Sequence, residues 1–98
     1  MRSMFNGCNS LIFINLTSFD TSKVTDMRYL FYNCHSLKYL DIPNFSPLNL
    51  ESIIYMFYNM SSLIYLNINS LEINTETSTD HSFDMLPSNL KICSSKYY

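Results

Sequence analysis

Three cysteines carry the most reactive side chains of this chain, and two of them lie 26 positions apart. Cys8 and Cys34 would form a disulfide if folding held their Cα atoms about 4.4–6.8 Å apart. The alternative, which we favour, is a buried apolar column, because Met60 and Leu86 continue the spacing and free cysteine packs as a small hydrophobe. Cys93 is left over, either free or paired outside this segment. With no Cys-x-x-Cys pair, the sequence predicts no zinc and no other cofactor.

Histidine and serine are the other candidates for catalysis. His35 and His81 have no cysteine, histidine or carboxylate at a recurring metal-ligand spacing, so we interpret both as solvated side chains. Serine is abundant, but no serine lies in a Gly-x-Ser-x-Gly nucleophile motif. The carboxylates are scattered along the chain. We therefore predict that the protein is not an enzyme.

The overall composition narrows the function further. The chain has 98 residues, enough for one small domain, and 47% of them are hydrophobic, enough for a folded core. Six basic and eight acidic residues give a net charge of −2, which argues against nucleic acid as a partner because such proteins carry a basic patch. A single glycine cannot build a glycine-rich phosphate loop.

A repeat of 26 residues organises the whole chain. Its clearest markers are four phenylalanines at Phe5, Phe31, Phe57 and Phe83. Agreement in many neighbouring columns indicates stacked copies of one structural unit. We expect a single repeat domain over 1–98, with units at 1–26, 27–52 and 53–78 and a C-terminal cap at 79–98.

Each unit is expected to contain one strand and one short helix. The pattern Leu-x-x-Leu-x-Leu/Ile at 11–16, 37–42 and 63–68 predicts the strands. The pattern Met-x-x-Met-Phe-x-x-Cys has helical spacing, which favours a short helix over a 3-10 turn. Because helices pack about 8–10 Å apart and strands about 4.8 Å, helices would curve the stack modestly. The predicted fold class is α/β, a leucine-rich-repeat solenoid of about three and a half coils, each with one short parallel strand and one short helix or 3-10 turn.

The two ends of the array are expected to differ. The last unit contains Pro87 and one extra residue before its leucine, Leu90, as suits a terminal cap. Met1 is already in register with the repeat, so we expect the C-terminal part of a longer array. The open first unit should then expose three apolar side chains, those of Leu11, Ile14 and Leu16. Preceding repeats of the same chain or self-association would cover that edge.

No membrane span is expected in this segment. Residues 52–71 carry no charge and number about 20, enough to cross a bilayer, but asparagines and serines interrupt them. Residues 1–16 show no signal peptide, because polar residues break any apolar core there.

The repeat unit Met-x-x-Met-Phe-x-x-Cys-x-Ser-Leu-x-x-Leu-Asp-Leu/Ile resembles that of the BspA-like leucine-rich-repeat surface proteins, in particular their 26-residue subtype. The clearest copies are Met27–Phe45 and Met1–Asp26, and Leu86–Cys93 resembles the close of such arrays. The resemblance implies a cell-surface or secreted location, adhesion or protein–protein contact, and no shared catalytic residues.

An aromatic column on the predicted strands is the feature that most suggests recognition. Phe13, Tyr39 and Tyr65 occupy a position that should face away from the core, and exposed aromatic rings are enriched at binding surfaces. The predicted ligand-binding residues are Phe13, Tyr39, Tyr65, Ile12, Lys38, Ile64, Asn15, Asp41 and Asn67. The alternatives are that neighbours partly cover the rings, and that the last three residues form only a solvated ladder. Two further tyrosine columns, Tyr29 with Tyr55 and Tyr32 with Tyr58, are expected to pack between units.

Three Asn-x-Ser/Thr patterns match the glycosylation acceptor motif, at Asn15, Asn44 and Asn59. Because asparagine is abundant, chance matches are expected. A glycan on Asn15 would block the aromatic column.

We predict a non-enzymatic protein–protein interaction or adhesion module of a cell-surface or secreted leucine-rich-repeat protein. Its ligand would be a protein of a host, of the matrix or of a neighbouring cell. The alternative is a purely structural role, as the closing coils and cap of a longer repeat stalk with no ligand of its own.

Overall fold

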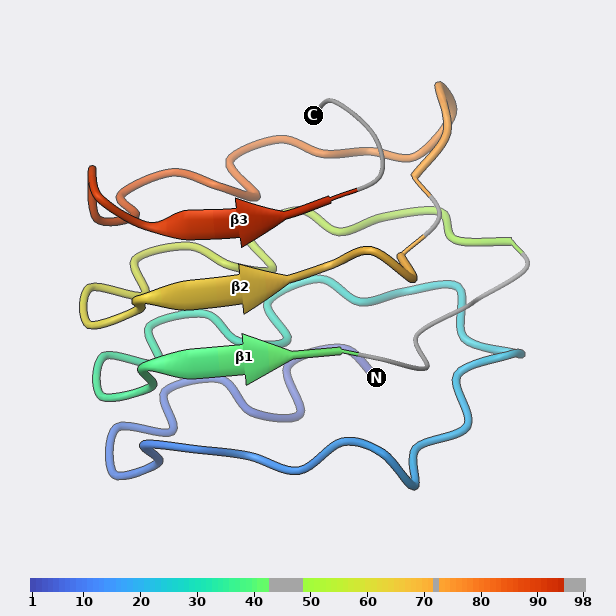
Figure 1. Ribbon diagram of the computed structural model, residues 1–98. Coiled ribbons are helices and arrows are strands. Elements are labelled where there is room, and N and C mark those ends of the chain that lie inside the picture. The colour runs from blue at the N-terminus through green and yellow to red at the C-terminus, as the bar shows by residue number, and fades with distance from the viewer. Residues whose placement is uncertain (43–48, 72, 95–98) are drawn as a thin grey trace.

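Three short parallel strands form one side of the molecule (Figure 1). They are β1 (Tyr39–Asp41), β2 (Tyr65–Asn67) and β3 (Lys91–Cys93), in the order β1-β2-β3. The computed structural model describes residues 1–42, 49–71 and 73–94. Turns and extended segments return behind the sheet from each strand to the next.

The predicted period of 26 residues is the pairing distance between neighbouring strands. Tyr65 pairs with Tyr39 on one side and with Lys91 on the other. The extra residue expected in the last unit is therefore wrong, because β3 keeps the same register. Asn89, exposed, then takes the place of the buried Leu63 one unit earlier. The last unit thus contributes less apolar surface to the core than the unit before it.

A second parallel ladder runs along the return side. Ser52 forms single bridges with Asp26 and with Ser78, again 26 residues away in each direction. The first unit joins the main sheet by one bridge only, between Phe13 and Tyr39, so the strand predicted at 11–16 is reduced to that bridge.

The predicted helices are absent from the described part of the chain. A helix needs every N–H to bond within its own segment, to the carbonyl four residues back. Here alternate N–H groups reach the next unit instead: Met27, Tyr29, Phe31 and Asn33 donate to Ser52, Ile54, Met56 and Tyr58. The N–H groups between them close tight turns, as Leu30 does to Met27. The helical spacing of apolar residues is therefore met by consecutive turns.

Left-handed backbone at two positions per unit explains why these turns cannot become a helix. In the second unit Tyr29 and Asn33 both have φ of 58°, and Tyr55 and Asn59 repeat this in the third. Such values interrupt a right-handed helix, and they are unusual for a bulky tyrosine. Gly7, with φ of 69°, takes the asparagine position in the first unit.

The absence of helices also removes the reason for curvature. Ring centroids on the turn side are 5.2 Å apart for Tyr32 and Tyr58, and 6.1 Å apart for Phe31 and Phe57. These distances are close to the spacing of paired strands, about 4.8 Å. Both sides of each unit therefore repeat at nearly the same distance.

The core lies between the two ladders and is built from stacked columns. Leu40 and Leu66 are fully buried beneath the sheet, and Phe31 and Phe57 are fully buried beneath the turns. Units in the middle of the stack bury these columns more completely than the units at its ends. The partly buried Phe5 and Phe83 extend the phenylalanine column in both directions.

The first unit is covered differently from what its sequence suggests. Leu16, expected to be exposed, is buried, and Leu11 and Ile14 are half-buried. The chain turns back directly after Leu16, where the Phe19 N–H donates to the Leu16 carbonyl at 3.1 Å. The exposed apolar side chain of this edge is instead Met4, at 52%.

The uncharged stretch at 52–71 lies within this stack. It contains a run of turns followed by β2. Among the residues that the structure describes, no helix is long and apolar enough to cross a bilayer.

Candidate functional site

The nine residues predicted from the sequence lie along the outer face of the sheet. In β1 and β2 the central leucines, Leu40 and Leu66, point inward, so the residues on either side of each point outward. We call the outward row the strand-face strip: Ile12, Phe13, Asn15, Lys38, Tyr39, Asp41, Ile64, Tyr65 and Asn67. Parallel pairing brings its members together, since Tyr39 pairs with Tyr65 and Asp41 with Asn67.

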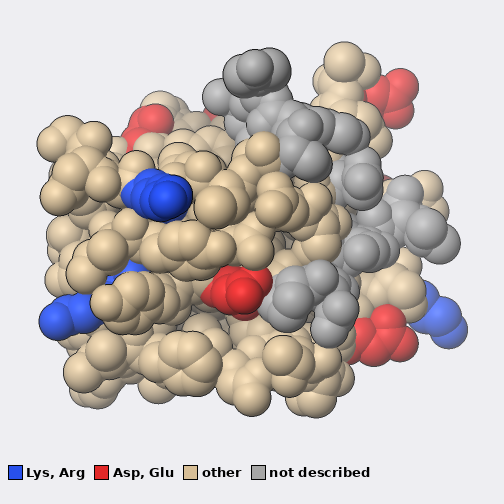
Figure 2. All heavy atoms as spheres, viewed as in Figure 1, with Lys and Arg blue, Asp and Glu red and all other residues tan. Residues whose placement is uncertain are grey.

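Four apolar side chains of the strip are at least half exposed. The exposed fractions are 65% for Phe13, 57% for Ile12, 51% for Ile64 and 50% for Tyr39. Tyr65 is half-buried. Uncharged side chains cover most of the face shown in Figure 2, with only isolated charged groups. An apolar row of this kind lowers its free energy when a partner removes it from water.

Two polar members of the strip use their side-chain oxygens within their own turns. Asn15 Oδ1 accepts hydrogen bonds from the N–H and the hydroxyl of Thr17, at 3.0 and 2.8 Å. Asn67 Oδ1 accepts one from the Asn69 N–H at 3.0 Å. These oxygens shape the chain after each strand segment, so they have a structural role beside any role in binding.

Tyr65 keeps its proton over a wide pH range. A hydrogen bond with the Cys93 side chain raises the pKa of its hydroxyl, and partial burial and the nearby Asp41 carboxylate act in the same direction. The charged side chains placed around this neutral aromatic row are Lys38 and Asp41, of opposite sign.

A small hollow lies at the first-unit end of the strip. Its volume is about 110 Å³, and its walls include Phe13, Asn15, Thr17 and Asp41. It is the place where the exposed phenylalanine and the asparagine turn meet.

The tyrosine columns of the turn side behave as predicted and pack between units. Tyr29 stacks on Tyr55 at 5.3 Å and Tyr32 stacks on Tyr58 at 5.2 Å, while edge contacts join the two columns. The His81 ring continues one column, 5.0 Å from Tyr55. We call Tyr29, Tyr32, Tyr55 and Tyr58 the tyrosine stack. Loss of solvation within it raises the pKa of Tyr55.

The matching family covers nearly all of these features. The family model described as "Mycoplasma protein of unknown function, DUF285" matches residues 1–94. The chain belongs to the DUF285 family. No curated protein and no solved structure matches it significantly. DUF285 is a repeat family related to the BspA-like surface proteins, so the resemblance in the sequence holds at the level of the family.

The cysteines of this DUF285 chain are free thiols. Cys34 is buried, and its thiol donates to the Phe5 carbonyl at 3.1 Å. Burial raises its pKa to about 11, so it stays protonated and unreactive at neutral pH. The structure thus supports the buried-column interpretation rather than a Cys8–Cys34 disulfide.

The two histidines lie in separate polar contacts. His35 Nδ1 is 3.4 Å from the Ser61 hydroxyl, and His81 Nδ1 is 2.6 Å from Asp84 Oδ2. Neither histidine is placed between a serine and a carboxylate in these contacts.

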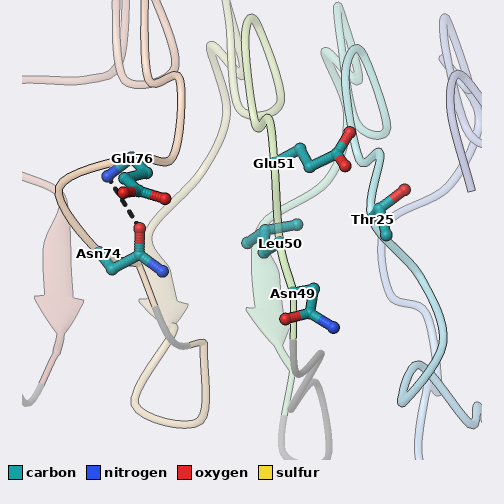
Figure 3. A pocket seen from close by; sticks show the side chains of 6 residues that line it. All are labelled: Thr25, Asn49, Leu50, Glu51, Asn74 and Glu76. Atoms are coloured by element: carbon teal, nitrogen blue, oxygen red, sulfur yellow. Dashed lines mark hydrogen bonds between the residues drawn. The ribbon is translucent and has the colours of Figure 1, made fainter.

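A second hollow, which the sequence did not suggest, opens on the return side (Figure 3). It measures about 500 Å³ and is lined by Thr25, Asn49, Leu50, Glu51, Asn74 and Glu76. Three neighbouring segments contribute these residues, and the Glu76 N–H donates to Asn74 Oδ1 at 2.8 Å. Within the described ranges, no three His, Cys, Asp or Glu side chains gather as metal ligands would. Its only sequence signal is the recurrence of polar residues just before the return ladder.

Proposed function

We propose that the chain is a leucine-rich-repeat solenoid segment of the BspA-like 26-residue subtype and acts as a non-enzymatic protein–protein interaction or adhesion module. The DUF285 match and the 26-residue pairing on both sides of the sheet support the solenoid assignment. We further propose that the protein works at the cell surface or after secretion, as its relation to BspA-like proteins implies.

One observation carries the interaction proposal: the strand-face strip is exposed where the other aromatic columns are packed. Phe13 and Tyr39 remain at least half exposed, although Phe31 and Phe57 at the same spacing are fully buried. Tyrosine and other large aromatic residues are the usual anchors of protein interfaces. The ligand is therefore a protein surface with apolar recesses that accept these rings.

The size of the strip indicates weak binding per chain. Four neighbouring segments at about 4.8 Å spacing span only about 15 Å, whereas a standard interface buries about 800 Å² on each partner. Additional units, or several chains on one surface, would raise the effective affinity by multivalency. Adhesion is a function that tolerates weak single contacts, which fits this geometry.

A binding assay with paired variants tests the proposal. Fluorescently labelled chain is added to immobilised fibronectin, laminin and collagen and to cultured epithelial cells. We expect binding to at least one surface, and a loss of about tenfold or more in the double variant Tyr39→Ser/Tyr65→Ser. The control Met4→Ser/Met85→Ser removes two exposed apolar side chains away from the strip and should bind as the wild type. Equal binding by both double variants would exclude the strip as the binding site.

The purely structural alternative is supported by the extent of stacking between units. Both ladders and all the buried columns serve unit-to-unit contact. If the wild-type chain binds no surface in the assay, this alternative is favoured. The location is tested separately, by surface labelling of cells followed by blotting with an antibody to residues 79–98. A labelled band is expected, and an unlabelled one would rule out the surface location.

A further inference from the structure

Asn15 stands beside an exposed aromatic ring and a hydroxyl on one side of the chain. Alternate residues of an extended segment point to the same side, which places Phe13, Asn15 and Thr17 together while Leu16 is buried. All three line the hollow of about 110 Å³ at the first-unit end of the strip. Asn15-Leu16-Thr17 also matches the acceptor motif for N-linked glycans.

The Asn15 amide is held by its oxygen only. Both hydrogen bonds from Thr17 end on Oδ1, and no described residue bonds to Nδ2. Asn15 is exposed, so Nδ2 is turned toward solvent. A substituent on the nitrogen would leave both hydrogen bonds intact, because the carbonyl oxygen keeps its lone pairs.

Asn59 has the same motif but the opposite situation. Its Nδ2 already donates to Asn33 Oδ1 at 3.1 Å, its backbone is left-handed, and it is half-buried beside the fully buried Met60. A glycan there would break the hydrogen bond between the two asparagines. The third motif, at Asn44, lies outside the described residues.

We propose that Asn15 is an N-glycosylation site and that the first sugar packs against Phe13 and Thr17. In the reaction, Nδ2 bonds to the anomeric carbon of a sugar carried on a polyprenyl pyrophosphate. The bond between that carbon and the phosphate oxygen breaks, polyprenyl pyrophosphate leaves with the electron pair, and one amide proton passes to a base of the transferase. The C–H face of the sugar then stacks on the electron-rich face of the Phe13 ring.

Modification in the cell rests on the proposed surface or secreted location, because the chain must meet the transferase in a secretory compartment. It would also divide the strand-face strip. A glycan over Phe13 covers the first-unit end and leaves Tyr39 and Tyr65 accessible, so glycosylation would narrow the surface open to a protein ligand.

The site can be tested on the purified, folded chain without assuming its location. The chain is incubated with a single-subunit eukaryotic oligosaccharyltransferase and a dolichyl-pyrophosphate-linked chitobiose donor, and occupancy is mapped by peptide mass spectrometry. Asn15 should be modified and Asn59 should not. Asn15→Gln and Thr17→Ala should abolish the modification at Asn15, whereas Ser61→Ala, which removes only the Asn59 motif, should leave it unchanged.

Synthetic peptides covering 11–20 and 55–64 supply the unfolded controls, and both should be modified. The proposal is overturned if the folded chain is modified at Asn59 as extensively as at Asn15. It is also overturned if Asn15 stays unmodified while its peptide is a substrate. Neither outcome depends on surface labelling or ligand binding, so the site and the proposed function can fail independently.

The packing of the sugar on Phe13 has its own readout. The glycan should raise the midpoint of thermal unfolding by about 4 °C in the wild-type chain, a shift typical of a modest stabilisation in a domain of this size. In Phe13→Ala, which keeps the acceptor motif, the glycan should leave the midpoint unchanged. An equal rise in both chains would show that the sugar does not pack on the ring.

Discussion

Aromatic residues recur every 26 positions on two faces of this protein, and the two faces use them differently. In the tyrosine stack, Tyr29 and Tyr55 lie face to face at 5.3 Å, and Tyr32 contacts both at its edge. In the strand-face strip, Tyr39 and Tyr65 are paired through their backbones, yet no ring contact joins them in the described structure. Equal spacing therefore does not give equal packing.

The difference arises from how many rings each unit offers. The turns supply two tyrosines per unit, three positions apart, so each ring meets neighbours above, below and beside it. The strand supplies one outward ring per unit, flanked by Ile64 or Lys38. Rings that satisfy one another stabilise the fold, and rings left exposed are available to a partner.

The largest contrast is expected between the buried phenylalanine column and the strip. Phe57→Ala should lower the free energy of unfolding by about 3–5 kcal/mol, because it leaves a cavity between Phe31 and Phe83. Phe13→Ala should change it by less than about 0.5 kcal/mol, because the ring is mostly in water. Urea denaturation of both variants checks the pair. Similar losses would mean that the strip is part of the core.

A smaller contrast separates the tyrosine stack from the strip. Tyr55→Ser should cost about 2 kcal/mol, because Tyr55 contacts Tyr29, Tyr32, Tyr58 and His81. Tyr39→Ser should cost less than about 0.5 kcal/mol. The same denaturation experiment measures both. A neutral Tyr55→Ser would show that the tyrosine stack contributes little to stability.

The left-handed position beside the stack gives the next effect. Asn59 has φ of 58° and donates to Asn33. Asn59→Ala and Asn59→Gly both lose that hydrogen bond, but only glycine adopts the backbone without steric cost. The glycine variant should be about 1 kcal/mol more stable than the alanine variant. Equal thermal midpoints would argue against this backbone conformation.

The smallest expected effect comes from the Asp26–Arg28 ion pair at the return ladder. Hydrogen bonds from the Arg28 side chain lower the pKa of Asp26 to about 2 from its ordinary 3.8. The unfolded chain therefore binds more protons between these values, and the stability from this pair is lost as pH falls from about 4 to 2. Because both side chains are about a third exposed, the loss should stay below about 1 kcal/mol.

Asp26→Asn should flatten that part of the stability–pH curve and leave the neutral region nearly unchanged. Acid titration of unfolding midpoints for both chains provides the comparison. A wild-type curve that is already flat between pH 2 and 4 would contradict the assigned pKa.

The sequence predicted the period, the strand positions and the residues of the strip, because side-chain alternation in a strand depends only on local geometry. It predicted helices wrongly, because positions 27, 30, 31 and 34 have the same spacing in a helix and in consecutive turns. What decides between them is where the alternate N–H groups bond, and that depends on the neighbouring unit. Asn33 and Asn59, which tolerate left-handed backbone, were the available signal for turns.

The exposure of the strip was predictable only in part. Phe13, Tyr39 and Ile64 face outward as their strand positions imply, but Tyr65 is half-buried because Cys93 and Asp41 lie beside it. The fate of Leu16 was missed, since the turn after it is formed by Phe19. Side-chain direction follows from the sequence, whereas the cover provided by neighbouring turns does not.

Hydroxyl-radical footprinting of the free chain, read residue by residue by mass spectrometry, tests the contrast between the two faces most directly. Comparing like residues cancels intrinsic reactivity, so Phe13 is compared with Phe31 and Tyr39 with Tyr55. We predict faster oxidation of Phe13 and of Tyr39 within their pairs. Oxidation of Tyr55 as fast as that of Tyr39 would contradict the account, because the tyrosine stack would then be as open to solvent as the strand-face strip.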